Sequence, residues 1–171
     1  MDEQQKFVVI VFPSGLQGRI WSTILRSQNC GVIWESPDVP LPETLQSLHQ
    51  QGGLPDLLII DIRLYRLQPW HLCRWCRQHN LDTKVLLVNG AQPRILATER
   101  QWALAQGAAD LLPRICRDSL MSGAAANLRR ALDVLNIEPF SQQSFIGSLL
   151  QMGLGSQPNV TINHRVPCEK I

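Results

Sequence analysis

The sequence lacks several features that would place a protein quickly in a class. No apolar run approaches the ~20 residues of a membrane-spanning helix, and residues 1–6 are too polar and acidic for a secretory signal peptide. The five cysteines are odd in number and irregularly spaced, which does not indicate a disulfide framework. We therefore expect a cytoplasmic protein with no membrane partner.

Common signatures of catalysis and nucleotide binding are also missing. The sequence contains no GxGxxG or GxxxxGKS/T fingerprint, and Gly153-Leu154-Gly155 is not a nucleotide-binding motif because no strand precedes it. No Ser–His–Asp or Cys–His arrangement can be defended from sequence alone. The net charge of +2, from 16 Lys and Arg against 14 Asp and Glu, is too small to predict a nucleic-acid partner.

What the sequence contains is an alternation of apolar strand-like runs with helical segments. Its 171 residues are 44% hydrophobic and 18% charged, as in a globular domain. The predicted strands are 7–12, 31–34, 56–61, 84–88 and 109–112. The predicted helices are 16–27, 42–51, 69–79, 93–106 and 118–135. Five strand–helix units predict an α/β domain with a parallel sheet covered by helices on both faces.

A change of character after Asn136 divides the chain into a domain at 1–136 and an extension at 137–171. Within the extension, 139–152 can form one short helix carrying Phe140 and Phe145, followed by an irregular tail. This helix can either pack back on the domain, which is the commoner outcome, or dock onto a partner.

The carboxyl ends of parallel strands form the working edge of such a sheet. The residues predicted there are Phe12, Pro13, Asp61, Asn89 and Arg114.

Three separated segments carry a resemblance to a known family. Residues 56–62, 70–74 and 107–114 resemble, in order and register, parts of the bacterial response-regulator receiver domain, and the likeness extends over about 6–136. Asp61 stands at the position of the phosphorylated aspartate. The resemblance implies a flavodoxin-like, doubly wound, five-stranded sheet of order 2-1-3-4-5. It also implies a non-enzymatic role in two-component phosphorelay signal transduction.

The residues around Asp61 depart from the family pattern. Receivers hold Mg²⁺ with two acidic residues after the first strand, where this chain has Phe12 and Pro13, and Ser14 is only a weak substitute ligand.

Three further family positions are also changed. Asn89 replaces the hydroxyl residue that binds the phosphoryl group, and Arg114 replaces the lysine that pairs with it. Leu111 replaces the aromatic switch residue. We therefore interpret the chain as a pseudo-receiver without a cofactor, in which Asp61 pairs with Arg114. The alternative is a working phosphoacceptor, with Asp61 as nucleophile and Mg²⁺ bound.

The resemblance also suggests a surface for partners. Receivers commonly use the face formed by the fourth helix, fifth strand and fifth helix, which lies within 93–135 here. We expect a sensor kinase or a downstream signalling protein to bind there, and a homodimer through the same face is plausible. The chain after the domain is too short for a helix-turn-helix output domain, which disfavours a DNA-binding transcription factor.

Two features compete with this interpretation. Cys73 and Cys76 form a CxxC flanked by histidines, but their place inside a helix favours core packing over a redox or metal site. Arg63, Arg66 and the arginines of 69–79 form either a solvated basic face or a patch for anions or nucleic acid. Any of the five tryptophans that is exposed would favour an interface.

Overall fold

The computed structural model describes residues 4–13 and 15–153, and these form a parallel sheet between two layers of helices. The strand order is β2-β1-β3-β4-β5, as the resemblance implied. The strands are β1 (Phe7–Val11), β2 (Gly31–Glu35), β3 (Leu57–Asp61), β4 (Lys84–Asn89) and β5 (Asp110–Pro113). The helices are α1 (Gly15–Arg26), α2 (Leu41–Gln51), α3 (Pro69–Gln78), α4 (Ala97–Ala105), α5 (Leu120–Leu135) and α6 (Gln142–Gln151), with a 3-10 turn η1 (Tyr65–Leu67).

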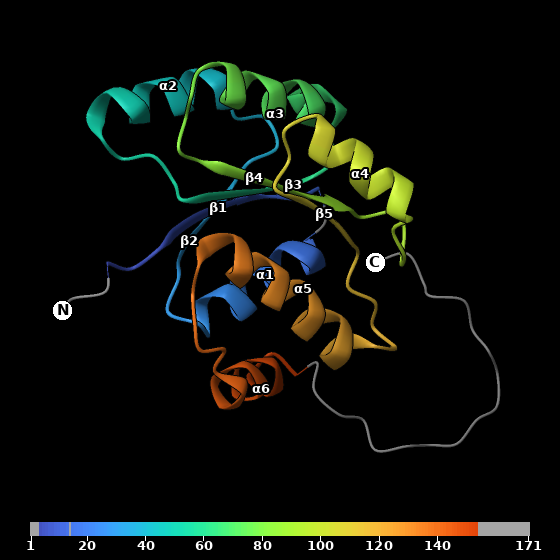
Figure 1. Ribbon diagram of the computed structural model, residues 1–171. Helices are drawn as coiled ribbons and strands as arrows, with labels where there is room; N and C mark the ends of the chain where they lie inside the picture. The colour runs from blue at the N-terminus through green and yellow to red at the C-terminus, as the bar shows by residue number, and fades with distance from the viewer. Residues whose placement is uncertain (1–3, 14, 154–171) are drawn as a thin grey trace.

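Each face of the sheet packs a separate hydrophobic core. Residues that alternate along β1 and β3 point to opposite faces, so Val8 and Ile10 lie with α1 and α5 while Val9 and Val11 lie with α2 and α3. Figure 1 shows the two helix layers, with α2, α3 and α4 above the sheet and α1, α5 and α6 below it. β3 is buried along its whole length, as expected for a central strand of a parallel sheet.

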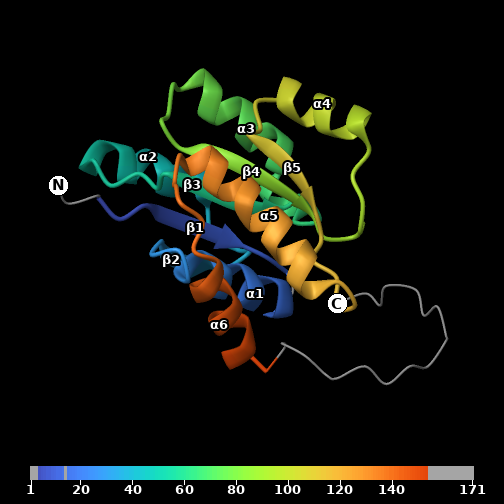
Figure 2. The ribbon, with the colours of Figure 1, turned by 60° about the horizontal axis from the view of Figure 1, so that its bottom comes forward.

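The predicted short helix after Asn136 is present as α6 and packs back onto the domain. Its buried Phe145 and Leu149 belong to the core shared with α1 and α5, and Figure 2 shows α6 lying against this layer. The buried Gln28 secures the entry to the helix, because its side chain donates to Ser141 O at 3.1 Å and accepts from Ser141 N at 2.8 Å. The predicted irregular tail lies outside the described residues.

The start of α4 differs from the prediction. The sequence places a helix start at Pro93, but α4 begins at Ala97. The reason is a cap further along the chain: Glu99 accepts from Leu96 N at 2.8 Å and so satisfies a donor at the true amino end. Residues 90–96 therefore form a loop at the carboxyl edge of the sheet.

Candidate functional site

The carboxyl edge of β3, β4 and β5 brings three of the predicted site positions onto adjacent strands. Asp61 is in register with Val88 on β4, and Asn89 is in register with Pro113 on β5. Asp61 and Asn89 therefore end neighbouring strands, and Arg114 follows the next one. This is the edge at which doubly wound domains bind ligands.

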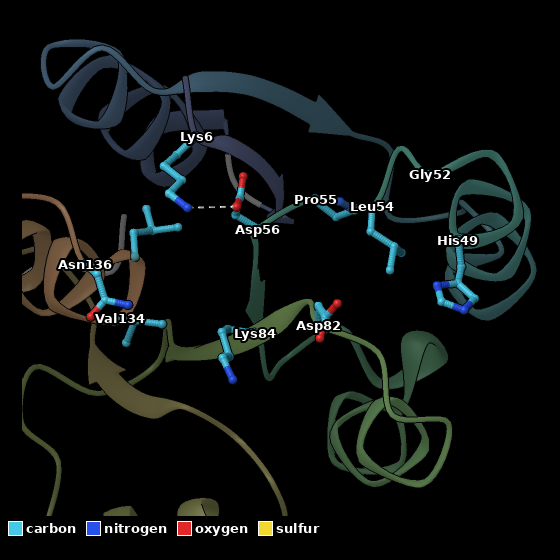
Figure 3. Close-up of a pocket in the computed structure, with 11 residues that line it drawn as sticks. Lys6, His49, Gly52, Leu54, Pro55, Asp56, Asp82, Lys84, Val134 and Asn136 are labelled. Atoms are coloured by element: carbon cyan, nitrogen blue, oxygen red, sulfur yellow. Dashed lines mark hydrogen bonds and ion pairs between the residues drawn. The ribbon is translucent and has the colours of Figure 1, made fainter. Parts of the chain in front are cut away.

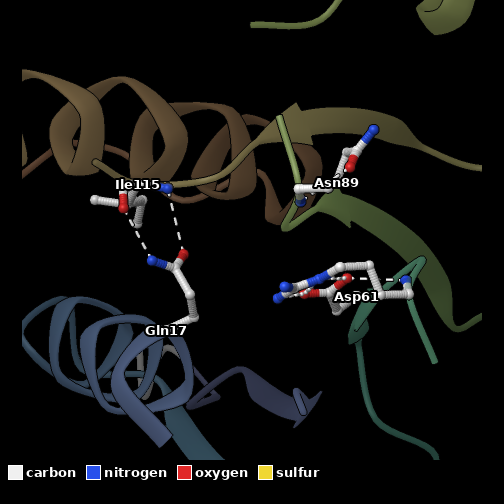
Figure 4. Close-up of polar contacts among 6 residues, drawn as sticks. Gln17, Asp61, Asn89 and Ile115 are labelled. Atoms are coloured by element: carbon white, nitrogen blue, oxygen red, sulfur yellow. Dashed lines mark hydrogen bonds and ion pairs between the residues drawn. The ribbon is translucent and has the colours of Figure 1, made fainter. Parts of the chain in front are cut away.

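Asp61 is completely buried and is held by Arg63 (Figure 4). The Arg63 Nη2 donates to Asp61 Oδ2 at 2.7 Å, and its Nε lies 3.1 Å from both carboxylate oxygens. Hydrogen bonding to Asp61 raises the pKa of Arg63 above its usual value. A buried carboxylate needs such a partner, because an unpaired charge is costly away from water.

The expected pairing of Asp61 with Arg114 is wrong, since the guanidinium that takes both carboxylate oxygens belongs to Arg63. The chain turns directly after β3, where Arg63 N donates to Asp61 Oδ1 at 2.9 Å. This turn returns the Arg63 side chain over the carboxylate two residues earlier. The sequence contained Arg63, but side-chain direction in a loop could not be read from it.

Gly90 makes room for this ion pair. A Cβ atom at position 90 would overlap with Asp61 Oδ2 and with the guanidinium of Arg63. The backbone of the β4–α4 loop thus lies directly over the pair, and only glycine allows this close approach. Gly90 was not singled out from the sequence, because an Asn-Gly pair there reads simply as a strand end.

The described residues near Asp61 do not fit a divalent cation. Phe12 is 2% exposed and stacks against Trp21 with ring centroids 6.4 Å apart, so the end of β1 contributes to the core. Hard cations need oxygen ligands, yet both oxygens of Asp61 accept from Arg63. Pro13 has no side-chain ligand, and Ser14 lies outside the described residues. In the described part of the chain, no three His, Cys, Asp or Glu side chains are grouped to hold a metal ion.

Asn89 and Arg114 are both buried beside the loops that follow their strands. Asn89 Oδ1 accepts from Ala91 N at 3.1 Å, so this amide stabilises its own loop. Arg114 N donates to Gln92 O at 2.9 Å, which ties the loop after β4 to the end of β5. The two residues occupy the phosphate-pocket positions of the resemblance.

Leu111, at the expected switch position, is 4% exposed and belongs to the core beneath α3 and α4. A polar contact that sequence reasoning missed ties the same edge together from α1. Gln17 is 1% exposed, donates to Ile115 O at 2.9 Å and accepts from Ile115 N at 3.2 Å (Figure 4). Such a reciprocal pair satisfies the backbone just after Arg114 and fixes α1 against this loop.

A second buried charge network joins α4, β5 and α5. Asp110 is 3% exposed and accepts from Arg100 Nε at 2.7 Å and from Arg130 Nε at 2.8 Å. One carboxylate thus faces two guanidinium groups, which leaves an excess of positive charge where these elements meet. Sequence reasoning placed Asp110 in a family motif and did not assign it partners.

The cysteines of α3 are core residues. Cys73 and Cys76 are 1% and 4% exposed. Burial, reinforced by Cys76, raises the pKa of Cys73 to about 12, and burial raises that of Cys76 to about 11. Because the thiolate is the reactive form, the raised pKa values disfavour reactivity at neutral pH, and the burial of both thiols favours the packing interpretation over a redox site.

A cavity lies at the amino ends of the strands, opposite the edge that holds Asp61 (Figure 3). It has a volume of about 460 Å³, and its wall includes Lys6 and Asp56, which form a salt bridge of 3.2 Å. Asp56 also accepts from Phe7 N at 2.8 Å, so it secures the start of β1. These contacts give the cavity wall a structural role at the amino ends of the strands.

Among the described residues, no helix combines the length and apolarity needed to cross a membrane. Trp21 is fully buried, whereas Trp34 and Trp102 are 40% and 50% exposed. Exposed tryptophan favours an interface, because burying its large apolar ring against a partner contributes strongly to the free energy of binding.

Solved structures with a similar fold include receiver domains of response regulators. The chain is similar to the signal receiver domain of the response regulator NarL from Mycobacterium tuberculosis, at 20% identity and a TM-score of 0.57, over 79% of this chain and 99% of that one. It is similar to a response regulator receiver protein from Burkholderia phymatum, at 23% identity and a TM-score of 0.57, over 78% of this chain and 98% of that one.

A third similar structure is described as an atypical orphan response regulator that revealed a phosphorylation-independent regulatory mechanism. It shares 14% identity at a TM-score of 0.53, over 79% of this chain and 99% of that one. No protein-family model and no curated protein matches the sequence. At these identities the likeness establishes the fold.

Proposed function

Starting from a chain that has the fold of a response-regulator receiver domain, we propose that it is a signalling protein that acts by contact with another protein. In this proposal Asp61 is not phosphorylated in a Mg²⁺-dependent reaction. The protein is not an enzyme and needs no cofactor. The similar orphan regulator, whose regulation is described as phosphorylation-independent, is a precedent for such a role on this fold.

The observation that carries the proposal is the ion pair between Arg63 and Asp61. Phosphorylation of a carboxylate requires a free oxygen nucleophile and a cation that offsets the charge of the phosphoryl group. Here Arg63 donates to both oxygens of Asp61 from within the fold. The pair is neutral overall, and the backbone of Gly90 lies so close to it that even a Cβ atom at position 90 would overlap with Asp61 Oδ2 and Arg63.

The surface that we propose for the partner is the face of α4, β5 and α5, within 93–135. The Arg100–Asp110–Arg130 network fastens the three elements to one another, so they present one rigid surface. Its exposed apolar side chains include Trp102, at 50%, and Leu104, at 46%. Rigid surfaces with exposed aromatic residues suit protein contacts, because little entropy is lost when they are covered.

Treatment with acetyl phosphate and Mg²⁺, followed by intact-mass measurement, tests the proposal. We expect no phosphoryl adduct on the wild-type chain, while a conventional receiver domain treated in parallel acquires one. The matched control is Asp61→Asn, which removes the nucleophile and keeps the shape of the side chain.

The opposite result would be an adduct of one phosphoryl group that is stable in acid, labile in base and absent from Asp61→Asn. It would overturn the proposal and would indicate a working phosphoacceptor in a two-component relay. Mg²⁺ titration gives an independent check, because only the relay predicts metal binding that Asp61→Asn abolishes.

A further inference from the structure

A groove of about 530 Å³ adjoins the Asp61–Arg63 pair on the side of α3. We call it the Tyr65 groove. It runs between η1 with the start of α3 and the loop after β4. Its wall includes two arginines, a histidine and two aromatic residues: Arg63, Tyr65, Trp70, His71 and Arg74. None of the described residues that line it has a carboxylate.

The charge along the groove is positive. The Arg63 side chain is 31% exposed and lines the groove, but its charge is balanced by Asp61, so the net positive charge of the groove comes from Arg74. Arg74 donates to the neutral side chain of Gln106, which leaves its charge uncompensated by that contact.

Two aromatic side chains, Tyr65 and Trp70, line the Tyr65 groove. Tyr65 is 81% exposed, a high value for a large side chain at the mouth of a concavity. Trp70 packs edge-on against Trp102 of α4 with ring centroids 4.4 Å apart. The half-exposed Trp102 therefore continues the apolar surface from the groove toward the α4–β5–α5 face, and both helices lie on the same side of the sheet (Figure 1).

We propose that the Tyr65 groove binds an acidic segment of the partner protein. A carboxylate of the segment bonds Arg74 and the outer side of Arg63, and an apolar side chain beside it covers Tyr65 and Trp70. This inference rests on the proposed function and names the chemistry of the partner. Guanidinium groups suit carboxylates because they donate two parallel hydrogen bonds.

Charge and shape favour an acidic peptide over other occupants. Nucleic acid would require a run of cations to neutralise successive phosphates, whereas this groove offers two arginines and one histidine. A small free anion would leave the aromatic walls uncovered, and their apolar area would contribute nothing to its binding. A second copy of the chain would have to supply an acidic segment from its own surface.

The experiment measures binding of three probes to the full chain by calorimetry. The probes are an acidic peptide of aspartates around one central leucine, its lysine counterpart, and inorganic phosphate. We expect binding of the acidic peptide only. Arg74→Gln and Tyr65→Ser should each weaken it about tenfold, which is the worth of one charge-assisted hydrogen bond or one covered aromatic ring.

The matched control is Arg77→Gln, on the same helix. Arg77 carries the same charge but lines a different concavity and donates to Ala105 O. Its replacement should leave the affinity for the peptide unchanged. An equal loss of affinity in Arg74→Gln and Arg77→Gln would mean that binding depends only on the net charge of the protein, and it would overturn the proposal. Phosphate binding as tightly as the peptide, or a dimer of the free chain that Arg74→Gln dissociates, would also overturn it.

The outcome is separable from that of the phosphorylation test. Peptide binding is measured without Mg²⁺ or a phosphodonor, and among the described residues the hydrogen bonds to the Asp61 carboxylate come from Arg63, not from Arg74 or Tyr65. Failure of the peptide to bind would leave the unphosphorylated state of Asp61 in place. Phosphorylation of Asp61 would leave the binding result in place.

Discussion

Arg63 donates to both carboxylate oxygens of Asp61 from only two residues further along the chain. The pair forms inside one short turn, so it does not depend on another element moving into place. Asp61 has no exposed surface, and Arg63 supplies the charge that its burial requires. The local sequence after β3 thus supplies, within the chain itself, the positive charge that the buried Asp61 needs.

Replacing Arg63 by an uncharged residue should destabilise the fold. Arg63→Met leaves Asp61 buried without its partner, and we expect the free energy of unfolding to fall by about 3 kcal/mol, as for broken buried ion pairs. Urea denaturation measures the change. Adding Asp61→Asn removes the orphaned charge, so the double variant should be more stable than Arg63→Met alone. Equal stability of the single variant and the wild type would show that the pair contributes nothing.

Gly90 should tolerate no side chain. In Gly90→Ala the new methyl group would overlap with both partners of the Asp61–Arg63 pair. We expect a loss of about 1–3 kcal/mol, typical of overpacked sites, measured by urea denaturation. Gly90 is not among the glycines with positive φ, so the loss would report this contact and not backbone strain.

The matched glycine is Gly147 in α6, where an added Cβ meets nothing within 4 Å. Gly147→Ala should be neutral or should stabilise the chain by up to about 1 kcal/mol, because glycine disfavours helix. A similar response at both positions would contradict the close approach at Gly90.

The sequence predicted the order of the elements well, because continuous apolar runs such as β3 have few alternative structures. It also placed Asp61, Asn89 and the residue after β5 on one edge, since parallel strands align their carboxyl ends. It did not predict which arginine pairs with Asp61. Arg63 and Arg114 carry the same charge, and the choice depends on the path of a loop.

Contacts between segments far apart in the chain could not be predicted from the sequence either. Gln17 and Ile115 are far apart in the chain, and a glutamine in a helix gives no signal of a buried partner. The start of α4 was misplaced because proline favours the first helical turn in general, whereas here Glu99 accepts a hydrogen bond from Leu96 N, three residues after Pro93, and α4 begins at Ala97. A tertiary contact decided the first feature, and a local capping hydrogen bond decided the second.

The buried thiols make stability depend on pH in the alkaline range. The pKa of Cys73 is raised to about 12 and that of Cys76 to about 11, from 9.0. The folded state therefore holds protons that the unfolded state releases. Their contribution to stability is fully present below pH 9.0 and is lost as pH rises toward about 11 and then about 12. Urea denaturation between pH 8 and pH 11 should show a declining midpoint.

Alkylation gives an independent measurement on the same groups. At pH 8 iodoacetamide should leave Cys73 and Cys76 unmodified in the folded chain and modify both in urea, as peptide mass mapping would show. Cys73→Ala with Cys76→Ala should make the fall in stability above pH 9.0, the pKa of an unperturbed thiol, less steep. Rapid modification of either thiol in the folded chain would instead support the redox interpretation.

The packing of α6 onto the domain can be tested with two apolar residues of that one helix. Phe145 is 2% exposed and lies 5.5 Å from the Phe140 ring, whereas Leu150 is 51% exposed. Phe145→Ala opens a cavity and should lower the free energy of unfolding by about 3–5 kcal/mol, while Leu150→Ala should change it by less than about 0.5 kcal/mol. If both variants unfold at the same urea concentration as the wild type, α6 is not part of the cooperative core. If only Phe145→Ala unfolds earlier, in a single transition, α6 folds with the sheet as one unit.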